Sequence, residues 1–209
     1  MNTRQLDLHA EQEQHLPLHG ASVSYIPGFF PVKTADGYLV DLIQCPDWQQ
    51  LPIVLFGKRM LQPRLIAWFG DPGVRYSYSG NHFEATGWIE PLGQIRRALQ
   101  QRLGISFNAV LCNRYRDGRD SMGWHSDDEH ELGAQPVIAS VSFGAVRQFR
   151  LREKGNTSRS VKMELGHGSV LVMAGDTQKN WQHCLPRTKN ACAERINLTF
   201  RSLPAPCNQ

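Results

Sequence analysis

A chain of 209 residues with 41% hydrophobic and 20% charged residues is long enough to bury a full core and has an ordinary globular composition. The net charge of +4 permits a polyanionic partner without requiring one. No apolar run reaches the roughly 18 residues of a membrane-spanning helix, so we expect no membrane partner. The five cysteines form no Cys-x-x-Cys pair, which argues against a disulfide framework and favours a reducing, cytoplasmic (intracellular) location.

The N-terminal segment differs in composition from the rest of the chain. Residues 1–20 are rich in Gln, Glu and His and contain no apolar core, so they predict a flexible tail and not a secretory signal. Aromatic residues and a turn over 25–30 open the ordered part. Residues 37–48 mix apolar and polar side chains, which fits either a short helix or an irregular stretch.

Residues 91–103 carry the clearest helical pattern in the sequence. Apolar residues recur every three or four positions on one stripe: Leu92, Ile95, Leu99 and Leu103. Pro91 suits the first turn of a helix, and Gly104 suits its C-terminal end. The sequence therefore predicts a helix over 91–103 with one face against a core.

After Gly104 the period of the apolar residues changes from helical to strand-like. Short β-type runs punctuated by Gly, Pro, Asn and Asp follow at close spacing, as in sandwiches and jelly rolls. The predicted strands cover 107–115, 137–143, 147–151, 161–165, 169–173 and 195–201. We expect a mainly β fold with flanking helices (α+β), in which the second half of the chain forms one β unit.

Three residues form a metal-ligand pattern that is split between two parts of the chain. His125 and Asp127 are two residues apart, so from a strand or its end they project to the same face, and His183 would arrive from another strand. Two imidazoles and one carboxylate are the facial triad of Fe(II) oxygenases, which leaves coordination positions open. A zinc hydrolase needs the same kind of open site, so the residues alone leave both readings open.

A His-x-Asp pair alone is a weak signal, because eight histidines in the chain make chance pairs common. His130 lies in an acidic stretch and is expected to be solvated. His167 lies in a Gly-His-Gly turn before an apolar strand and is expected to be structural.

Residues 195–201 alternate strictly between apolar and polar side chains. Ile196, Leu198 and Phe200 share one face, and Arg195, Asn197, Thr199 and Arg201 share the other. Two arginines on the inner face of a barrel are costly unless each meets an anion, and guanidinium groups bind carboxylates through paired hydrogen bonds. A dicarboxylate such as 2-oxoglutarate would satisfy both. Asn113 and Tyr115 share a strand face and can donate into the same cavity, although a solvent-exposed polar face is the ordinary alternative.

Together these motifs resemble the AlkB family of Fe(II)/2-oxoglutarate-dependent dioxygenases. The resemblance rests on Asn113-Arg-Tyr115, His125-x-Asp127, His183 and Arg195-x-Asn197-x-x-x-Arg201, in that order. The segment Gln62-Pro-Arg64, the segment Tyr76-Ser-Tyr78-Ser-Gly80 and the apolar run over 138–144 are also similar to the family. The similarity covers residues 20 to 203.

The resemblance implies a fold and a set of site residues. It implies a single domain over 21–205, with a helix-containing substrate-recognition extension over 21–104 and a double-stranded β-helix (jelly-roll) core over 105–203. Fe(II) would bind to His125, Asp127 and His183, with 2-oxoglutarate and O2 as co-substrates. Arg195 would pair with the distal carboxylate of 2-oxoglutarate and Arg201 would lie near its keto-acid end. The residues that would assist them are Asn113, Tyr115 and Asn197.

The resemblance also implies an activity. Members of the family oxidatively demethylate N-alkylated nucleobases such as 1-methyladenine and 3-methylcytosine, which makes the chain a candidate for direct-reversal repair of alkylated DNA or RNA. The ring of Tyr78 and that of His125 would sandwich the flipped base, with Tyr76 beside it and Glu129 contacting its edge. A monomer is expected.

Two alternatives remain at this point. The same iron and 2-oxoglutarate chemistry could act on a protein or lipid, or the chain could be a catalytically inactive nucleic-acid-binding module, against which the complete ligand set argues. Six arginines are candidates for phosphate contacts: Arg59, Arg64, Arg75, Arg114, Arg116 and Arg119.

Overall fold

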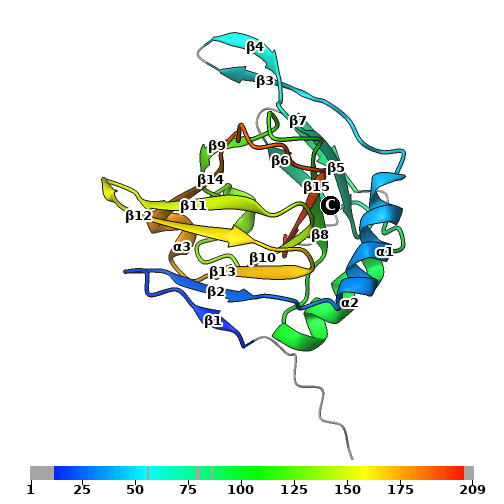
Figure 1. Ribbon diagram of the computed structural model, residues 1–209, viewed down its shortest axis with the longest axis horizontal. Helices are drawn as coiled ribbons and strands as arrows, with labels where there is room; N and C mark the ends of the chain where they lie inside the picture. Colours follow the sequence, from blue (N-terminus) through cyan, green and yellow to red (C-terminus); the bar gives the residue numbers. More distant parts are fainter. Residues whose placement is uncertain (1–11, 56, 79–80, 86, 205–209) are drawn as a thin grey trace, which may run out of the picture.

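Two antiparallel β-sheets face each other in the computed structural model, which describes residues 12–55, 57–78, 81–85 and 87–204 (Figure 1). The major sheet contains, in spatial order, β1 (Gln14–His15), β2 (Ser22–Ile26), β13 (Ser169–Ala174), β10 (Ile138–Gly144), β15 (Arg195–Arg201), β8 (Ala109–Tyr115) and β5 (Leu65–Gly70). The minor sheet contains β12 (Asn156–Leu165), β11 (Arg147–Glu153), β14 (Trp181–Leu185) and β9 (Met122–His125). This arrangement is a jelly roll, which is one of the two architectures that the strand pattern left open and the one that the family resemblance implied.

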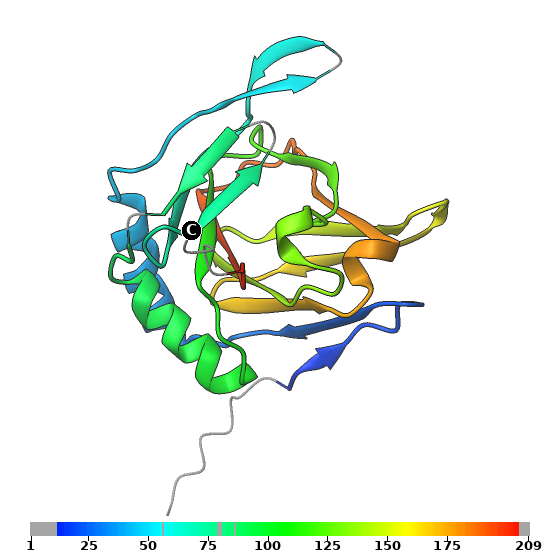
Figure 2. The same ribbon diagram turned by 180° about the vertical axis from the view of Figure 1, so that it is seen from behind.

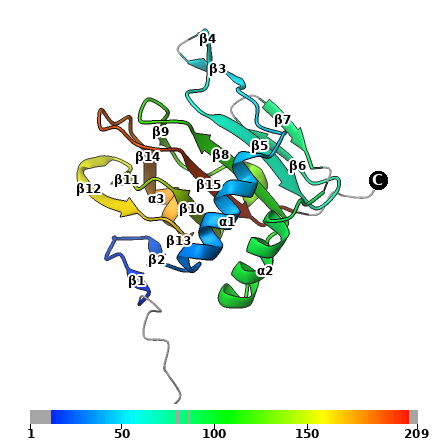
Figure 3. The same cartoon turned by 45° about the vertical axis from the view of Figure 1, so that its right-hand side comes forward.

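Two ribbons and the helices complete the fold. The ribbons pair β3 (Pro52–Leu55) with β4 (Lys58–Leu61) and β6 (Arg75–Tyr78) with β7 (Asn81–Glu84). The helices are α1 (Val32–Ile43), α2 (Leu92–Leu103) and α3 (Thr177–Asn180), and a 3-10 turn, η1, spans His130–Leu132. The β3–β4 ribbon projects away from the body, whereas α1 and α2 lie side by side along one flank (Figure 2 and Figure 3). Among the helices of the described residues, none is long and apolar enough to cross a bilayer.

Strand β15 shows why the major sheet needs a cover on each side. All seven of its residues are buried. Its apolar face (Ile196, Leu198 and Phe200) packs into a core that also contains residues of α1 and α2. The opposite, polar face turns toward the minor sheet and lines the cavity between the two sheets. Strict alternation therefore puts an apolar core on one side of β15 and a polar site on the other.

The helix predicted over 91–103 is confirmed as α2, and Gly104 ends it in the left-handed conformation with a φ of 69°. The segment 37–48, for which a helix and an irregular stretch were both open, is helical only in its first part. Helix α1 begins five residues earlier, at Val32, and ends at Ile43. Pro31 precedes it, a residue type whose fixed φ favours the start of a helix.

The predicted tail over 1–20 is wrong in its last part. Gln14–His15 forms β1 and pairs with β2. Leu18 belongs to a hydrophobic core with Leu151 and Trp181, and Leu16 packs against that core. Residues 1–11 lie outside the described residues. A strand of two residues is too short to show an alternating pattern in the sequence, so it is recognised only by its pairing with β2.

The boundary expected between 104 and 105 does not confine the β unit to the second half of the chain. Strand β2 joins the major sheet beside β13, and β5 joins it beside β8. The first half of the chain thus supplies strands on both sides of the central strands. Sheet edges expose unpaired backbone groups, and these N-terminal strands cover them.

Gly168 allows the turn before β13 to approach the start of α1. Its φ is +71°, and a Cβ atom there would lie 2.6 Å from the carbonyl oxygen of Phe30. Gly37, in contrast, lies inside α1 with open space around it. We expect Gly168→Ala to lower the free energy of unfolding by about 2–4 kcal/mol, because it combines a left-handed backbone with a clash against backbone.

The control, Gly37→Ala, is expected to raise the free energy of unfolding by about 0.5–1 kcal/mol, because alanine is the better helix former. Urea denaturation of both variants measures the two changes. Equal effects of the same sign would contradict this reading of the turn.

Candidate metal centre and co-substrate pocket

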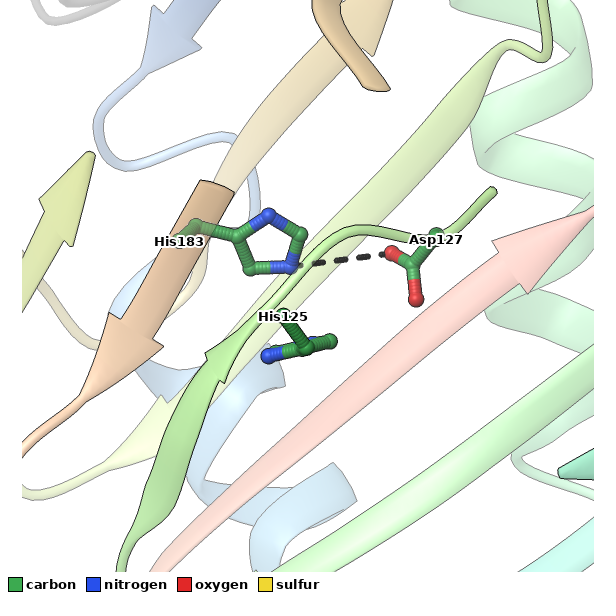
Figure 4. Close-up of side chains that lie close together, drawn as sticks. All are labelled: His125, Asp127 and His183. Atoms are coloured by element: carbon green, nitrogen blue, oxygen red, sulfur yellow. Dashed lines mark ion pairs between the residues drawn. The ribbon is translucent and has the colours of Figure 1, made fainter. Parts of the chain in front are cut away.

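His125, Asp127 and His183 meet between the two sheets (Figure 4). His125 ends β9, Asp127 follows that strand, and His183 lies opposite His125 in the register of β14 with β9. One potential ligand atom from each residue lies within 4.8 Å of the others. The Nε2 atom of His183 is 3.7 Å from Oδ2 of Asp127, and the two imidazole centroids are 4.1 Å apart. The strands thus bring together the three residues that the spacing singled out.

Neighbouring groups orient each of the three side chains. Nδ1 of His125 lies 2.9 Å from the carbonyl oxygen of Gly123, which can only accept, so Nδ1 carries the proton and Nε2 is left with its lone pair. The backbone N–H of Asp127 donates to Oε1 of Gln178 at 2.9 Å. The ring of Phe149 stacks on His183 at 5.4 Å.

The protonation states suit metal coordination, which requires neutral imidazoles and an ionised carboxylate. Burial lowers the pKa of His183 to about 3, and burial also lowers the pKa of His125. Burial alone would raise the pKa of Asp127, but the charge of Arg201 and the two histidines outweigh it, and the pKa lies below its usual range. All three groups are therefore ready to act as ligands at neutral pH.

The two carboxylate oxygens of Asp127 are treated differently. Oδ1 accepts a hydrogen bond from Nη2 of Arg201 at 2.8 Å. Oδ2 is buried and accepts no hydrogen bond from any described residue. A buried carboxylate oxygen without a partner is costly, and a cation beside it removes that cost. The donor set fits a divalent cation of the Fe(II) or Zn(II) type.

A cavity opens between the two sheets, and all three predicted ligands, His125, Asp127 and His183, line it. Its apolar lining includes Leu111, Met122, Phe149, Leu165 and Leu185. Its polar lining includes all five residues predicted to bind 2-oxoglutarate: Asn113, Tyr115, Arg195, Asn197 and Arg201. The pairing of β15 with β8 places Arg195 opposite Tyr115 and Asn197 opposite Asn113.

Arg195 is a buried cation without a carboxylate partner among the described residues. Its Nη2 donates to Oγ of Ser142 at 2.9 Å, whereas Nε and Nη1 are buried without a hydrogen-bond acceptor. Burial lowers the pKa of Arg195 to about 10. The ring of Tyr115 lies 5.3 Å from its Cζ atom. A guanidinium group in this state lacks an anion, and a carboxylate in the cavity would supply one.

Arg201 has its anion within the protein. It donates to Asp127, and its Cζ atom lies 5.2 Å from the ring centre of Tyr76. Burial opposes its charge, but Asp127 outweighs burial and raises the pKa of Arg201. Arg201 therefore orients the carboxylate of Asp127, a predicted metal ligand, as well as lining the cavity.

Arg64 lies in the interior rather than on a surface that could touch phosphate. It is 4% exposed, and its Nε donates to Oδ1 of Asn113 at 2.8 Å. Because Oδ1 is the acceptor in this bond, the amide group of Asn113 can present its NH2 donor elsewhere. The expectation of a phosphate contact at Arg64 is wrong. The guanidinium positions a cavity residue instead.

The residues predicted to contact a base are only partly described. Tyr76 is 1% exposed and stacks on Trp68 with centroids 4.9 Å apart, and it faces Arg201 rather than lining the cavity. Burial raises the pKa of Glu129, and the charge of Asp127 raises it further. Glu129 also interacts with the hydroxyl group of Tyr76. The side chain of Tyr78 lies outside the described residues.

Several residues of the site were missed by the sequence analysis. Ser140 and Ser142 of β10 accept hydrogen bonds from Asn197 and Arg195. The signal was present, since two serines alternate with apolar residues in an otherwise apolar run over 138–144. Gln178, which accepts from Asp127, lies in the short helix α3 and follows no pattern that predicts a contact with the metal ligands.

The chain matches the 2OG-Fe(II) oxygenase superfamily over residues 22–201. It is 40% identical over 210 residues to the alpha-ketoglutarate-dependent dioxygenase alkB homolog 3 of Rattus norvegicus, which covers 96% of this chain and 70% of that protein. It is 43% identical over 158 residues to the DNA oxidative demethylase ALKBH2 of Homo sapiens, covering 72% of this chain and 60% of the relative. The structure of OsALKBH1 superposes with a TM-score of 0.66 over 91% of this chain and 100% of that chain, at 17% identity, and so shares the fold.

Gln178 provides a test of the metal centre that leaves the three ligands in place. We expect Gln178→Ala to weaken Fe(II) binding about tenfold, because the hydrogen bond that holds the backbone of Asp127 is lost. Anaerobic Fe(II) titration followed by intrinsic fluorescence measures the affinity. His130→Ala is the matched control, because His130 is exposed and should leave the affinity unchanged.

Thermal unfolding of both variants without metal shows whether the loss is confined to the site. An unchanged affinity for Fe(II) in Gln178→Ala would contradict the proposed support of Asp127.

Proposed function

Because this chain belongs to the AlkB family of Fe(II)/2-oxoglutarate-dependent dioxygenases, we propose that it oxidatively demethylates N-alkylated bases in DNA. The chain is an Fe(II)/2-oxoglutarate-dependent dioxygenase, and its family supports nucleic-acid repair as its role. One observation carries the proposal within the structure. A clustered metal-ligand triad and a buried arginine that lacks an anion share a single cavity.

His125, Asp127 and His183 would hold Fe(II), and the orphaned Oδ2 of Asp127 supports this assignment. Bound iron supplies the site at which O2 is activated, so that the methyl carbon leaves as formaldehyde while 2-oxoglutarate becomes succinate and carbon dioxide. The protein would keep the carboxylate of Asp127 ionised and the imidazoles of His125 and His183 neutral, as metal binding requires. Arg201 keeps the carboxylate ionised and oriented, and the apolar lining limits access of water.

The arginines of β15 would hold 2-oxoglutarate. Arg195 would pair with the distal carboxylate, because two of its donors lack acceptors. Arg201 would lie near the keto-acid end, close to the metal ligands, which its bond to Asp127 supports. Asn113, Tyr115 and Asn197 would supply further hydrogen bonds from the same lining. Two charged ends would thus be recognised at two places of one cavity.

The β6–β7 ribbon would form the substrate-facing part of the N-terminal region, with Tyr78 stacking on the base. Glu129 would contact its edge, and the buried Tyr76 would hold the Glu129 carboxylate in place beside the base. Alkylated DNA is the proposed partner, and methylated RNA is the comparison that an assay must include. A monomer is part of this proposal. An intracellular location is supported by the free thiols of Cys45, Cys112, Cys184 and Cys192.

The central test is turnover of a methylated oligonucleotide. We expect formaldehyde and succinate to be released in equal amounts from DNA containing 1-methyladenine or 3-methylcytosine, with Fe(II) and 2-oxoglutarate present. Mass spectrometry of the oligonucleotide should show the loss of the methyl group. Failure on every methylated DNA and RNA, with turnover of a methylated protein instead, would replace this proposal by the protein-demethylase alternative.

Arg195→Met separates binding of the co-substrate from stability of the fold. We expect the KM for 2-oxoglutarate to rise about a hundredfold, because a buried charge-assisted contact is worth roughly 3 kcal/mol. The free energy of unfolding without co-substrate should stay the same or increase, because a buried charge without an anion is removed. Steady-state kinetics and urea denaturation measure the two effects.

Arg147→Met is the matched control, since Arg147 is also buried but donates to the carbonyl groups of Asp117, Asp120 and Pro186. Its loss leaves three carbonyl oxygens without a donor, so the free energy of unfolding should fall by about 2–4 kcal/mol. A similar fall in Arg195→Met would show that Arg195 supports the fold rather than awaits an anion.

A further inference from the structure

The face of the minor sheet that turns away from the cavity carries a strip of aromatic and cationic side chains. We define the outer strip as Trp124 of β9, Arg150 and Arg152 of β11, and Lys162 of β12. The four strands lie side by side in the order β12-β11-β14-β9 (Figure 1). The neighbours of these residues along the strands, His125 and Leu151, point inward to the cavity and the core. Alternation therefore turns the strip outward.

Trp124 and Arg152 form the ordered end of the strip. The Cζ atom of Arg152 lies 4.2 Å from the ring centre of Trp124. Nε and Nη2 of Arg152 both donate to Oε1 of Gln182, at 3.0 and 2.8 Å. Trp124 nevertheless keeps 37% of its surface exposed. An indole ring is thus held in place at the surface by a guanidinium group, with area left for a further planar partner.

At the other end of the strip, two cations, Arg150 and Lys162, lie next to each other. They are direct cross-strand partners in the register of β11 with β12, and like charges placed opposite each other destabilise a sheet. No described carboxylate makes an ion pair with Arg150, Arg152 or Lys162; the ion pairs nearby use Lys154 and Arg159 instead. Glu164 is an acid on this face, and it lies opposite Gln148.

Most of the arginines expected to contact phosphate show the opposite situation. Arg75, Arg114, Arg116 and Arg119 each pair with a carboxylate of the protein. Their charges are already balanced, so contact with a phosphate would require a break in an existing pair. The three cations of the outer strip make no ion pair with a described carboxylate, so a phosphate could contact them without breaking an existing ion pair.

We propose that the outer strip binds the single-stranded DNA that flanks the alkylated base. The proposal rests on the proposed function and deepens it. Cations without acids provide phosphate contacts, and an exposed indole provides a platform for a base, which is the combination that binds single strands. A duplex would not offer the face of a base to Trp124, because its bases are stacked on one another.

The place of the strip supports a continuous path from the lesion. Trp124 immediately precedes His125, so one strand carries a metal ligand on its inner side and the indole on its outer side. From β9 to β12 the sheet spans roughly 14 Å, at about 4.8 Å per strand. This width accommodates several phosphates of one strand.

The test compares a long and a short substrate with the same lesion. The long one is a single strand of about 20 nucleotides with a central 1-methyladenine, which exceeds the length that one binding groove covers. The short one is a trinucleotide with the same lesion, which reaches only the cavity. For Arg150→Gln/Lys162→Gln we expect the KM for the long strand to rise about tenfold with kcat unchanged. The kcat/KM for the trinucleotide should not change.

Direct binding provides a readout that does not depend on turnover. Fluorescence anisotropy with the labelled long strand gives the slope of the logarithm of the binding constant against the logarithm of the salt concentration. In the double variant this slope should be less steep by about 1.4, about 0.7 for each of two phosphate contacts. Trp124→Ala should weaken binding about tenfold, and Trp124→Phe should restore most of it because stacking is retained.

Lys33→Gln/Arg97→Gln is the matched control, because it removes the same charge from exposed positions of α1 and α2. An equal loss of affinity in this control would overturn the proposed role of the outer strip in binding DNA. An unchanged KM and salt slope in Arg150→Gln/Lys162→Gln would overturn it as well. Equal losses on the trinucleotide would also overturn it, because the residues would then act on the cavity. A wild-type protein that demethylates neither substrate overturns the proposed function, and the anisotropy comparison still decides the outer strip.

Discussion

Burial of two guanidinium groups on a single strand is the constraint on which the rest of this structure depends. Arg195 and Arg201 are each 2% exposed, and desolvation of such a group costs several kcal/mol unless an anion compensates it. The charge of Arg201 is compensated by Asp127. Arg201 in turn lowers the pKa of Asp127 and orients its carboxylate. Arg195 has a serine hydroxyl and an aromatic ring, and its remaining donors stay without acceptors. The fold thus holds one cation satisfied and the other ready for an anion.

The layers of the fold follow from the same strand. Because β15 alternates, its apolar face must be covered, and α1 and α2 provide that cover together with Trp88 and Phe107. Its polar face cannot pack against an apolar layer, so the minor sheet stands opposite it and the cavity lies between. The predicted metal ligands come from the minor sheet or follow one of its strands, and the predicted co-substrate residues come from the major sheet. The reaction site is therefore the place where two differently specialised sheets meet.

The sequence predicted the site better than the outline of the fold. Strand β15 and helix α2 were predicted nearly residue by residue, because each has a strong period and, in α2, a clear end at Gly104. The three predicted ligands do lie together in the structure; the His-x-Asp spacing suggested two of them, and the family resemblance selected His183 as the third. Strands β2 and β5 were missed, since short runs acquire their identity from the partners that they pair with. Arg64 stood among six candidates for phosphate contacts, because an arginine's sequence neighbours do not reveal whether it is buried.

Because side chains alternate along each strand, the minor sheet faces the cavity with one set of residues and the surface with another. On β9, the inward His125 belongs to the metal centre, and the adjacent Trp124 lies at the surface under Arg152. On β11, Phe149 and Leu151 close the cavity and core, and Arg150 and Arg152 face outward. A buried arginine suits one small dicarboxylate, because desolvation makes each contact strong and specific. Exposed cations suit a polymer, because many weak and screened contacts add along a chain. Whether a cation is buried or exposed, more than the number of cations, therefore decides which ligand it suits: the small dicarboxylate in the cavity or the DNA strand on the surface.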